Sequence, residues 1–276
     1  MKSGTLYIVS TPIGNLEDIT LRAIRVLKEV DLIAAEDTRH TRKLLNKFEI
    51  DVPLTSYHDH NKEDKGPVLV AQLLEGKSVA LVSDAGTPGI SDPGYFLINL
   101  AIDQMVPVVP IPGATAAIAA LSISGLPTDS FVFEGFLPSK HTARIKRLEE
   151  MVSEKRTLVF YEAPHRIIQT IDDMMNVFGE RKAVLTRELT KVHEETIRGS
   201  LSEILDRLRT GTTKGEFSII VRGASEAPMK RDIDTMEYLK DLMLHRGLSK
   251  KQAISVAAEE LQLPKKDVYK ESLKLE

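Results

Sequence analysis

The sequence of 276 residues contains no cysteine and carries a net charge of only −3. The absence of thiols excludes disulfide bonds, thiol catalysis and cysteine-ligated zinc, and it is typical of a reducing compartment. The small net charge excludes a general attraction to nucleic acid, so any RNA binding requires a local basic patch. The first residues also lack the apolar segment and cleavage site of a signal peptide, and we therefore expect a cytoplasmic protein.

One long segment, residues 105–128, carries no charge and has the length of a membrane span. Its prolines and glycines exclude a single lipid-exposed helix. We expect instead a buried strand at 106–111, a turn at Pro112-Gly113, and a buried helix from about Ala114. The segment is therefore predicted to be core, with no membrane partner.

Two further kinds of site are poorly supported. No Gly-x-Ser-x-Gly elbow occurs, which disfavours a hydrolase. His58 and His60 form a His-x-His pair, but they come without a placed carboxylate or a third ligand. We therefore expect no metal site.

Short apolar runs alternate with helical patterns through most of the chain. In the first block, strands are expected at 5–10, 32–35, 53–56, 79–83 and 106–111, with helices near 21–30, 41–47, 66–74 and 94–101. In the second block, strands are expected at 131–134, 157–161, 183–186, 194–198 and 217–221, with helices at 142–152, 166–177 and 201–208. Such alternation predicts an α/β fold with sheets covered on both faces. We expect two α/β domains, 1–113 and 114–225, hinged near Pro112-Gly113.

After about residue 225 the strand signals end and a helical extension, 226–276, follows. Ser249 is an expected N-cap, and Leu263-Pro264 interrupts the pattern before a last helix. Two Lys-Lys pairs are its local basic points, while its total charge is nearly balanced. Two interpretations remain open here, a solvated helical cap and an RNA-binding module.

Residues 83–94 (SDAGTPGISDPG) are the most informative segment of the chain. They follow the apolar run 79–82, contain three glycines and lead to an expected helix start at Asp92-Pro93. Glycines let a backbone approach a ligand, and open α/β sheets bind ligands beyond the carboxyl ends of their strands. The loop lacks both the G-x-G-x-x-G spacing and a P-loop lysine, so neither nucleotide fingerprint applies. It predicts a loop for another ligand, with an ordinary strand-to-helix turn as the alternative.

Other expected strands also lead into small or polar residues. These segments are STPIGNL (10–16), EDTRH (36–40), YEAPHR (161–166) and TRELTK (186–191), and the last strand is entered through KGEF (214–217). The adjacent carboxylates Glu36 and Asp37 are suited to a cation, a hydroxyl or, with Arg39, a phosphate. The alternative is a helix cap with a surface ion pair. If both sheets open on one cleft, all these ends converge there.

Taken together, these segments resemble the tetrapyrrole methylase superfamily of S-adenosylmethionine (SAM) methyltransferases over residues 5–225. More narrowly, they resemble the branch that methylates the 2′-hydroxyl of a cytidine in the decoding region of 16S ribosomal RNA. The motifs that carry the resemblance are 10–16, 35–39, 83–94, 110–114, 160–166 and 187–190, in family order. The resemblance implies two α/β domains, the second with a mixed sheet, SAM in the cleft between them, a small helical C-terminal extension, and a homodimer.

The same resemblance assigns the residues that contact SAM. They are Pro12, Gly14, Ser83, Asp84, Ala85, Gly86, Thr87, Thr115, Ala116, Tyr161 and Leu189. Backbone groups of small-residue loops can reach the adenosine and methionine portions, and Asp84 can offset the positive charge of the ligand. The chain departs from the family at Lys62, where we expect glutamate, and this puts any role of that carboxylate in doubt.

The implied reaction is an in-line methyl transfer to a ribose hydroxyl, for which the protein must align the reactants. Because a hydroxyl is a poor nucleophile, a proton acceptor is expected. Glu36 and Asp37 are the first candidates for this catalytic role, and Glu162 and His165 are the second. Any of these could instead form an interdomain salt bridge.

The expected partner is 16S ribosomal RNA within the small ribosomal subunit, with its phosphates on Arg39, Arg166 and Arg187. Two alternatives remain. A methylase of a small, tetrapyrrole-like molecule would need no extended basic rim around the cleft. A non-catalytic ribosome-assembly binder would fail to bind SAM, although the cofactor loops look intact.

Overall fold

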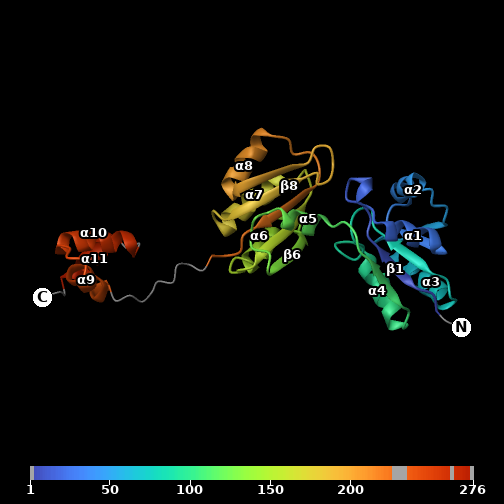
Figure 1. Ribbon diagram of the computed structural model, residues 1–276, viewed down its shortest axis with the longest axis horizontal. Helices are drawn as coiled ribbons and strands as arrows, with labels where there is room; N and C mark the ends of the chain where they lie inside the picture. The colour runs from blue at the N-terminus through green and yellow to red at the C-terminus, as the bar shows by residue number, and fades with distance from the viewer. Residues whose placement is uncertain (1–2, 226–234, 262–263, 274–276) are drawn as a thin grey trace. The chain divides into compact units, whose positions relative to one another are not determined.

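The computed structural model describes residues 3–225, 235–261 and 264–273 (Figure 1). Two compact units are present, Met1–Gly223 and Ala224–Glu276. The larger unit contains two five-stranded sheets, so the predicted α/β class is confirmed.

The first sheet is entirely parallel and has the strand order β3-β2-β4-β1-β5. Its strands are β1 (Leu6–Val9), β2 (Leu32–Ala35), β3 (Leu54–Ser56), β4 (Val79–Val82) and β5 (Val108–Ile111). The central strands are apolar on both faces, as a parallel sheet covered on both sides requires. All five carboxyl ends meet at one edge, where open α/β sheets bind ligands.

Helices cover both faces of this sheet. They are α1 (Leu21–Glu29), α2 (Thr38–Lys47), α3 (Lys62–Leu74) and α4 (Gly94–Asp103), with a short 3-10 turn η1 (Leu16–Asp18) before α1. α1 and α2 pack on one face through Leu27 and Leu45. α3 and α4 pack on the other face through Leu73 and Leu97. The helix α2 begins at Thr38, three residues before its predicted start, because Asp37 caps it.

The second sheet is mixed, with the order β6-β7-β10-β8-β9. Its strands are β6 (Phe131–Phe136), β7 (Thr157–Glu162), β8 (Lys182–Arg187), β9 (Glu195–Ser200) and β10 (Phe217–Val221). Only β6 and β7 are parallel. The carboxyl ends of β7 and β8 therefore lie at the same edge as the first residue of β10.

One helix covers one face of the second sheet and three cover the other. α5 (Ala116–Ser122) packs through Ala120 and Leu121. The opposite face carries α6 (His141–Glu150), α7 (Ile167–Phe178) and α8 (Leu201–Thr210). The uncharged segment 105–128 thus contains β5, a turn and α5, as predicted. In the part of the chain that the structure describes, no helix is long and apolar enough to span a membrane.

The C-terminal unit is helical, as expected for the extension. It contains α9 (Thr235–Leu244), α10 (Lys250–Glu260) and α11 (Lys265–Ser272), which share a core around Leu239, Leu242 and Ile254. Ser249 accepts a hydrogen bond from the backbone N–H of Gln252, which confirms its capping role. Pro264 precedes α11, while Leu263 and residues 226–234 lie outside the described residues.

Candidate functional site

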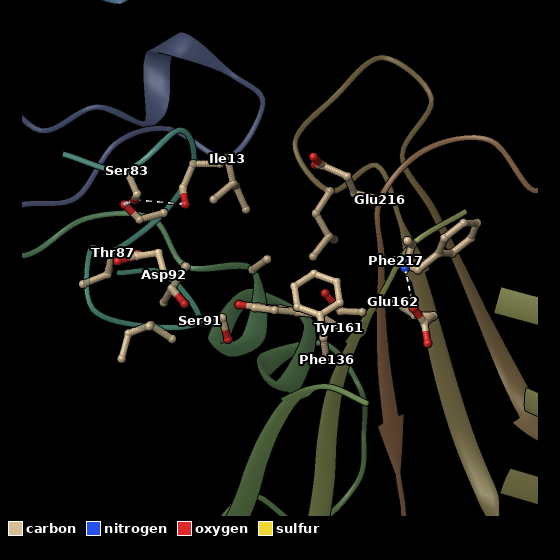
Figure 2. A pocket seen from close by; sticks show the side chains of 18 of the residues that line it. Ile13, Ser83, Thr87, Ser91, Asp92, Phe136, Tyr161, Glu162, Glu216 and Phe217 are labelled. Atoms are coloured by element: carbon tan, nitrogen blue, oxygen red, sulfur yellow. Dashed lines mark hydrogen bonds between the residues drawn. The ribbon is translucent and has the colours of Figure 1, made fainter. Parts of the chain in front are cut away.

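A cavity of about 440 Å³ lies between the two sheets of the larger unit (Figure 2). The first sheet contributes Glu36 after β2 and the loop after β4, and the second contributes the ends of β6, β7 and β8 and the start of β10. Its lining residues are Ile13, Glu36, Ser83, Ala85, Gly86, Thr87, Ile90, Ser91, Asp92, Thr115, Ala116, Phe136, Tyr161, Glu162, Ala163, Pro164, Thr186, Leu189, Glu216, Phe217 and Ser218. The predicted convergence of strand ends on one cleft is therefore observed.

The loop after β4 is fixed by its own polar contacts and by the end of β1. Thr11 and Gly86 exchange backbone hydrogen bonds of 2.9 and 3.1 Å, and the Ser10 and Thr87 hydroxyls lie 2.8 Å apart. Asp92 accepts hydrogen bonds from the N–H groups of Gly89 and Gly94, at 2.7 and 2.8 Å. These contacts fix the loop in place as one wall of the cavity. Ser83 and Thr87 of this loop are labelled in Figure 2.

Glu36 is the half-buried carboxylate of this wall. Its Oε2 accepts a 3.4 Å hydrogen bond from the backbone N–H of Asp84. Burial raises the pKa of Glu36 above its ordinary value, and the negative charges of Asp84, Asp92 and Asp59 raise it further. A carboxylate with a raised pKa in a cavity is suited to accept a proton.

Asp37, its neighbour, has a different position. It is absent from the cavity lining and is the N-cap of α2, where its carboxylate accepts from the N–H groups of Arg39 and His40. These hydrogen bonds, together with the Arg39 side chain, lower the pKa of Asp37. The geometry therefore favours the cap interpretation for Asp37 over the catalytic one.

Aromatic rings form the facing wall. Tyr161 accepts a 3.0 Å hydrogen bond from the N–H of Ala117, which ties β7 to the start of α5, and burial raises the pKa of its phenol. Phe133 and Phe136 pack against the Tyr161 ring at 5.1 and 5.6 Å between centroids. Phe136 remains 53% exposed although it lines the cavity. An exposed ring in a cavity can stack on a flat ligand.

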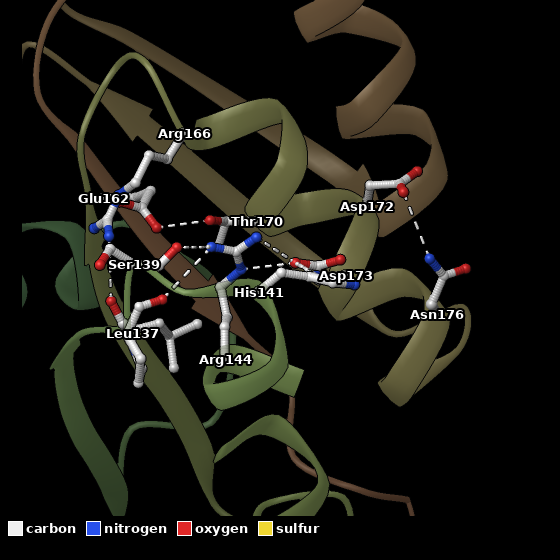
Figure 3. A network of polar contacts seen from close by, with 11 residues as sticks. Leu137, Ser139, His141, Arg144, Glu162, Arg166, Thr170, Asp172, Asp173 and Asn176 are labelled. Atoms are coloured by element: carbon white, nitrogen blue, oxygen red, sulfur yellow. Dashed lines mark hydrogen bonds and ion pairs between the residues drawn. The ribbon is translucent and has the colours of Figure 1, made fainter. Parts of the chain in front are cut away.

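Glu162 lines the cavity, but its carboxylate is occupied by hydrogen bonds with Arg166 and Thr170 (Figure 3). Its Oε1 accepts from Arg166 at 2.5 Å and from the backbone N–H of Ala163, and its Oε2 accepts from the Thr170 hydroxyl at 2.7 Å. The Glu162 side chain is fully buried. All these contacts lie between the end of β7, the turn after it and α7. This arrangement favours a structural role for Glu162 and Arg166, which hold the Ala163-Pro164 segment against the cavity.

Loss of Arg166 should therefore destabilise the fold. Arg166→Ala leaves a buried carboxylate without its charged partner, and we expect a loss of about 3 kcal/mol or more in the free energy of unfolding. The double variant Glu162→Gln/Arg166→Gln should lose less free energy of unfolding than the sum of the losses of Glu162→Gln and Arg166→Gln measured singly. Urea unfolding measures both. Unchanged stability with weaker RNA binding and a shallower salt dependence would instead favour the phosphate role expected from the sequence.

The loops around residues 14 and 190 close one side of the cavity. The N–H of Asn15 donates to the Thr190 hydroxyl at 3.0 Å, and a Cβ added to Gly14 would lie 2.4 Å from a carbon of the Lys191 side chain. The Lys191 ammonium bridges Glu188 and Glu216. Gly14 thus allows a close contact between the two halves of the unit.

The structure brings together most, but not all, of the residues expected from the sequence. The lining includes Glu36, Glu162, Ser83, Ala85, Gly86, Thr87, Thr115, Ala116, Tyr161 and Leu189. It does not include Pro12, Gly14, Asp84, Asp37, His165, Arg39, Arg166 or Arg187. His165 is exposed at the surface, and Arg187 pairs with Glu195 at 2.9 Å. Asp84 lies behind the lining, where its carboxylate accepts a hydrogen bond from the backbone N–H of Asp37.

Two kinds of lining residue escaped the sequence analysis. Ile90, Ser91 and Asp92 belong to a recognised motif, but no pattern shows which of its members face the cavity. Phe136 lies outside every motif, at the end of a strand that the apolar pattern predicts two residues too short. Lys62, at the departure from the family pattern, pairs with Asp59 at 2.9 Å. Among the described residues, no group of three or more His, Asp or Glu side chains is arranged to hold a metal ion.

Comparison with known proteins agrees with this architecture. The model of the family described as tetrapyrrole (corrin/porphyrin) methylases matches residues 5–205. A protein named ribosomal RNA small subunit methyltransferase I from Halalkalibacterium halodurans is 51% identical, over 96% of this chain and 93% of its own length. Its namesake from Synechocystis is 49% identical, over 99% of each chain.

Solved structures share the fold at lower identity. A uroporphyrin-III C-methyltransferase from Thermus thermophilus, determined in complex with S-adenyl homocysteine, superposes with a TM-score of 0.55. It is 19% identical, over 79% of this chain and 97% of that one. Its likeness supports the two-sheet fold alone. The chain therefore belongs to the tetrapyrrole methylase family, in the group that includes the proteins named ribosomal RNA small subunit methyltransferase I.

Proposed function

We propose that this protein is an SAM-dependent methyltransferase of small-subunit ribosomal RNA. Within that activity, we propose the 2′-hydroxyl of a cytidine in the decoding region of 16S RNA as the acceptor. The names of the relatives support the RNA substrate. The observation that carries the chemistry is Glu36, a half-buried carboxylate with a raised pKa in the wall of an intersheet cavity.

The cavity fits SAM in size and in character. Its volume lies in the range of sites for small molecules and cofactors. Ile13, Phe136 and Leu189 offer apolar contacts, and the carboxylates of Glu36 and Asp92 provide a negative wall for a cationic ligand. When bound, SAM supplies a methyl group on a positively charged sulfur, so the chain has to position the reactants more than to activate the donor.

The residues proposed to hold SAM come from both sheets. They are Ser83, Ala85, Gly86 and Thr87 from the loop after β4, Thr115 and Ala116 before α5, and Tyr161 and Leu189 from the second sheet. Pro12, Gly14 and Asp84 would support these loops from outside the lining. Tyr161 has a double role, because its hydroxyl also fixes the start of α5.

Glu36 is the proposed proton acceptor for the ribose hydroxyl. Its Oε2 is held by the Asp84 N–H, and among the described residues its Oε1 has no hydrogen-bond partner. One carboxylate oxygen is thus fixed while the other is free to accept a proton. The alternative acceptor His165 lies on the surface outside the lining, and Glu162 is bound by Arg166.

Transfer of a labelled methyl group tests this function. Small ribosomal subunits and free 16S RNA are each incubated with SAM labelled in its methyl group, and the RNA is digested to nucleosides. We expect the label in 2′-O-methylcytidine. Label on a nucleobase would contradict the ribose acceptor, and no label in either RNA would contradict RNA methylation. The proposed homodimer is checked separately by light scattering.

A further inference from the structure

The exposed face of α2 is basic along its whole length. Arg39, Arg42, Lys43, Asn46 and Lys47 are exposed and follow one another at helical spacing, while Thr41, Leu44 and Leu45 are buried on the opposite face. The helix contains no acidic residue. The nearest acidic residues along the chain are Asp37 at its N-cap and Glu49 and Asp51 beyond its end.

These cations have few partners in the protein. Within the described ranges, Arg42, Lys43 and Lys47 form no ion pair. The Arg39 side chain makes two long contacts with Asp37, of 3.4 and 3.5 Å, while 91% of it is exposed. Arginines elsewhere at the cavity edge are paired, as Arg166 is with Glu162 and Arg187 with Glu195. Like charges three and four residues apart disfavour an isolated helix. An external anion would offset that repulsion.

The position of α2 connects this face to the site. Glu36 lines the cavity, Asp37 caps the helix, and α2 begins at Thr38. The basic face therefore starts at Arg39, three residues from the proposed proton acceptor, and follows a ten-residue helix that is about 15 Å long. α2 lies on the outer surface of the first sheet, beside α1 (Figure 1).

We propose that the basic face of α2 binds the phosphates of the RNA strand next to the nucleotide in the cavity. This inference rests on the proposed function. When the target nucleotide of an RNA strand enters the cavity, the nucleotides on either side of it must lie on the protein surface at the cavity edge. The target nucleotide must also be unpaired. Contacts to phosphates position such a strand without reading its sequence. Arg42, Lys43 and Lys47 are thus positioning residues, and specificity comes from the cavity.

The test compares two triple variants of the full chain. Arg42→Gln, Lys43→Gln and Lys47→Gln remove three charges from α2. The matched control is Lys28→Gln in the last turn of α1, Lys182→Gln at the first residue of β8 and Arg222→Gln directly after β10, all at exposed positions. Binding of a 16S RNA transcript is measured at several salt concentrations, SAM binding by calorimetry, and methyl transfer with labelled SAM.

We expect the α2 variant to bind RNA roughly tenfold or more weakly at low salt. The slope of log affinity against log salt should become shallower by about 2, since each single-strand phosphate contact contributes about 0.7. SAM binding should be unchanged, and the control variant should match the wild type. If the wild type methylates RNA while both variants share its affinity and slope, the α2 assignment is wrong and the function stands. If the wild type neither binds nor methylates RNA, both are wrong.

Discussion

Glu36→Gln should lower the turnover of bound substrate about 10²- to 10⁴-fold, the contribution typical of a positioned general base. The amide keeps the size of the side chain and its acceptor oxygen toward the Asp84 N–H, so SAM and RNA binding should change little. Single-turnover methyl transfer at saturating RNA measures the chemical step. Full turnover in this variant would contradict the role of Glu36.

Asp37→Asn is the matched control for Glu36. It changes the adjacent carboxylate in the same way, but Asp37 caps α2 outside the cavity lining. We expect turnover close to that of the wild type and at most a small loss of stability, because asparagine also caps helices well. The reverse pattern, with turnover lost only in Asp37→Asn, would assign the base to Asp37.

The pH dependence gives an independent signature of Glu36. The acceptor works only in its ionised form, and burial together with neighbouring acids raises its pKa. The wild-type rate should therefore fall as the pH drops through that raised pKa, at a higher pH than an ordinary glutamate would give. The residual rate of Glu36→Gln should lack this acidic limb.

Gly86→Val should reduce the affinity for SAM by at least about a hundredfold. Gly86 has φ +83°, a conformation that costs a β-branched residue about 1–3 kcal/mol. A Cβ there would meet only ordinary contacts, with Ile13 at 3.7 Å and Ala114 at 3.8 Å. The expected damage therefore comes from distortion of the loop and from methyl groups in the cavity, and not from a clash with the protein.

Gly125→Val separates these causes. Gly125 has φ +72° with no atom within 4 Å of an added Cβ, and it is absent from the cavity lining. Gly125→Val should lower the melting temperature about as much as Gly86→Val does, and it should leave the SAM affinity measured by calorimetry unchanged. Equal SAM affinities in the two variants would place the ligand away from the loop after β4.

The positions of the strands could be predicted from the sequence because apolar runs are local. The strands β2 and β10 match their predicted bounds, and the other strands differ at their ends by two residues or fewer. The location of the candidate ligand site at the edge where the carboxyl ends meet could also be predicted, because strands that alternate with helices form a parallel sheet. Helix starts were less predictable: α3 begins at Lys62, four residues early, with Pro67 inside it. A proline in a helical pattern is ambiguous when only the sequence is known.

The roles of charged residues could not be predicted, because an ion pair depends on contacts distant in space. Glu36 and Asp37 are adjacent in sequence, yet one faces the cavity and the other caps a helix. Arg166 lies in a motif with His165, but the turn between β7 and α7 brings its side chain back onto Glu162. The sequence suggests phosphate binding for Arg166, whereas the burial of its side chain and its pairing with Glu162 favour a structural role.

A crystal structure with S-adenosylhomocysteine tests the central claim most directly. We expect the ligand in the intersheet cavity, in contact with the loop after β4, Thr115 and Tyr161, and with its sulfur on the side of Glu36. The same crystals of Glu36→Gln should show the same ligand position. A ligand bound outside this cavity, or with its sulfur remote from Glu36, would contradict the account.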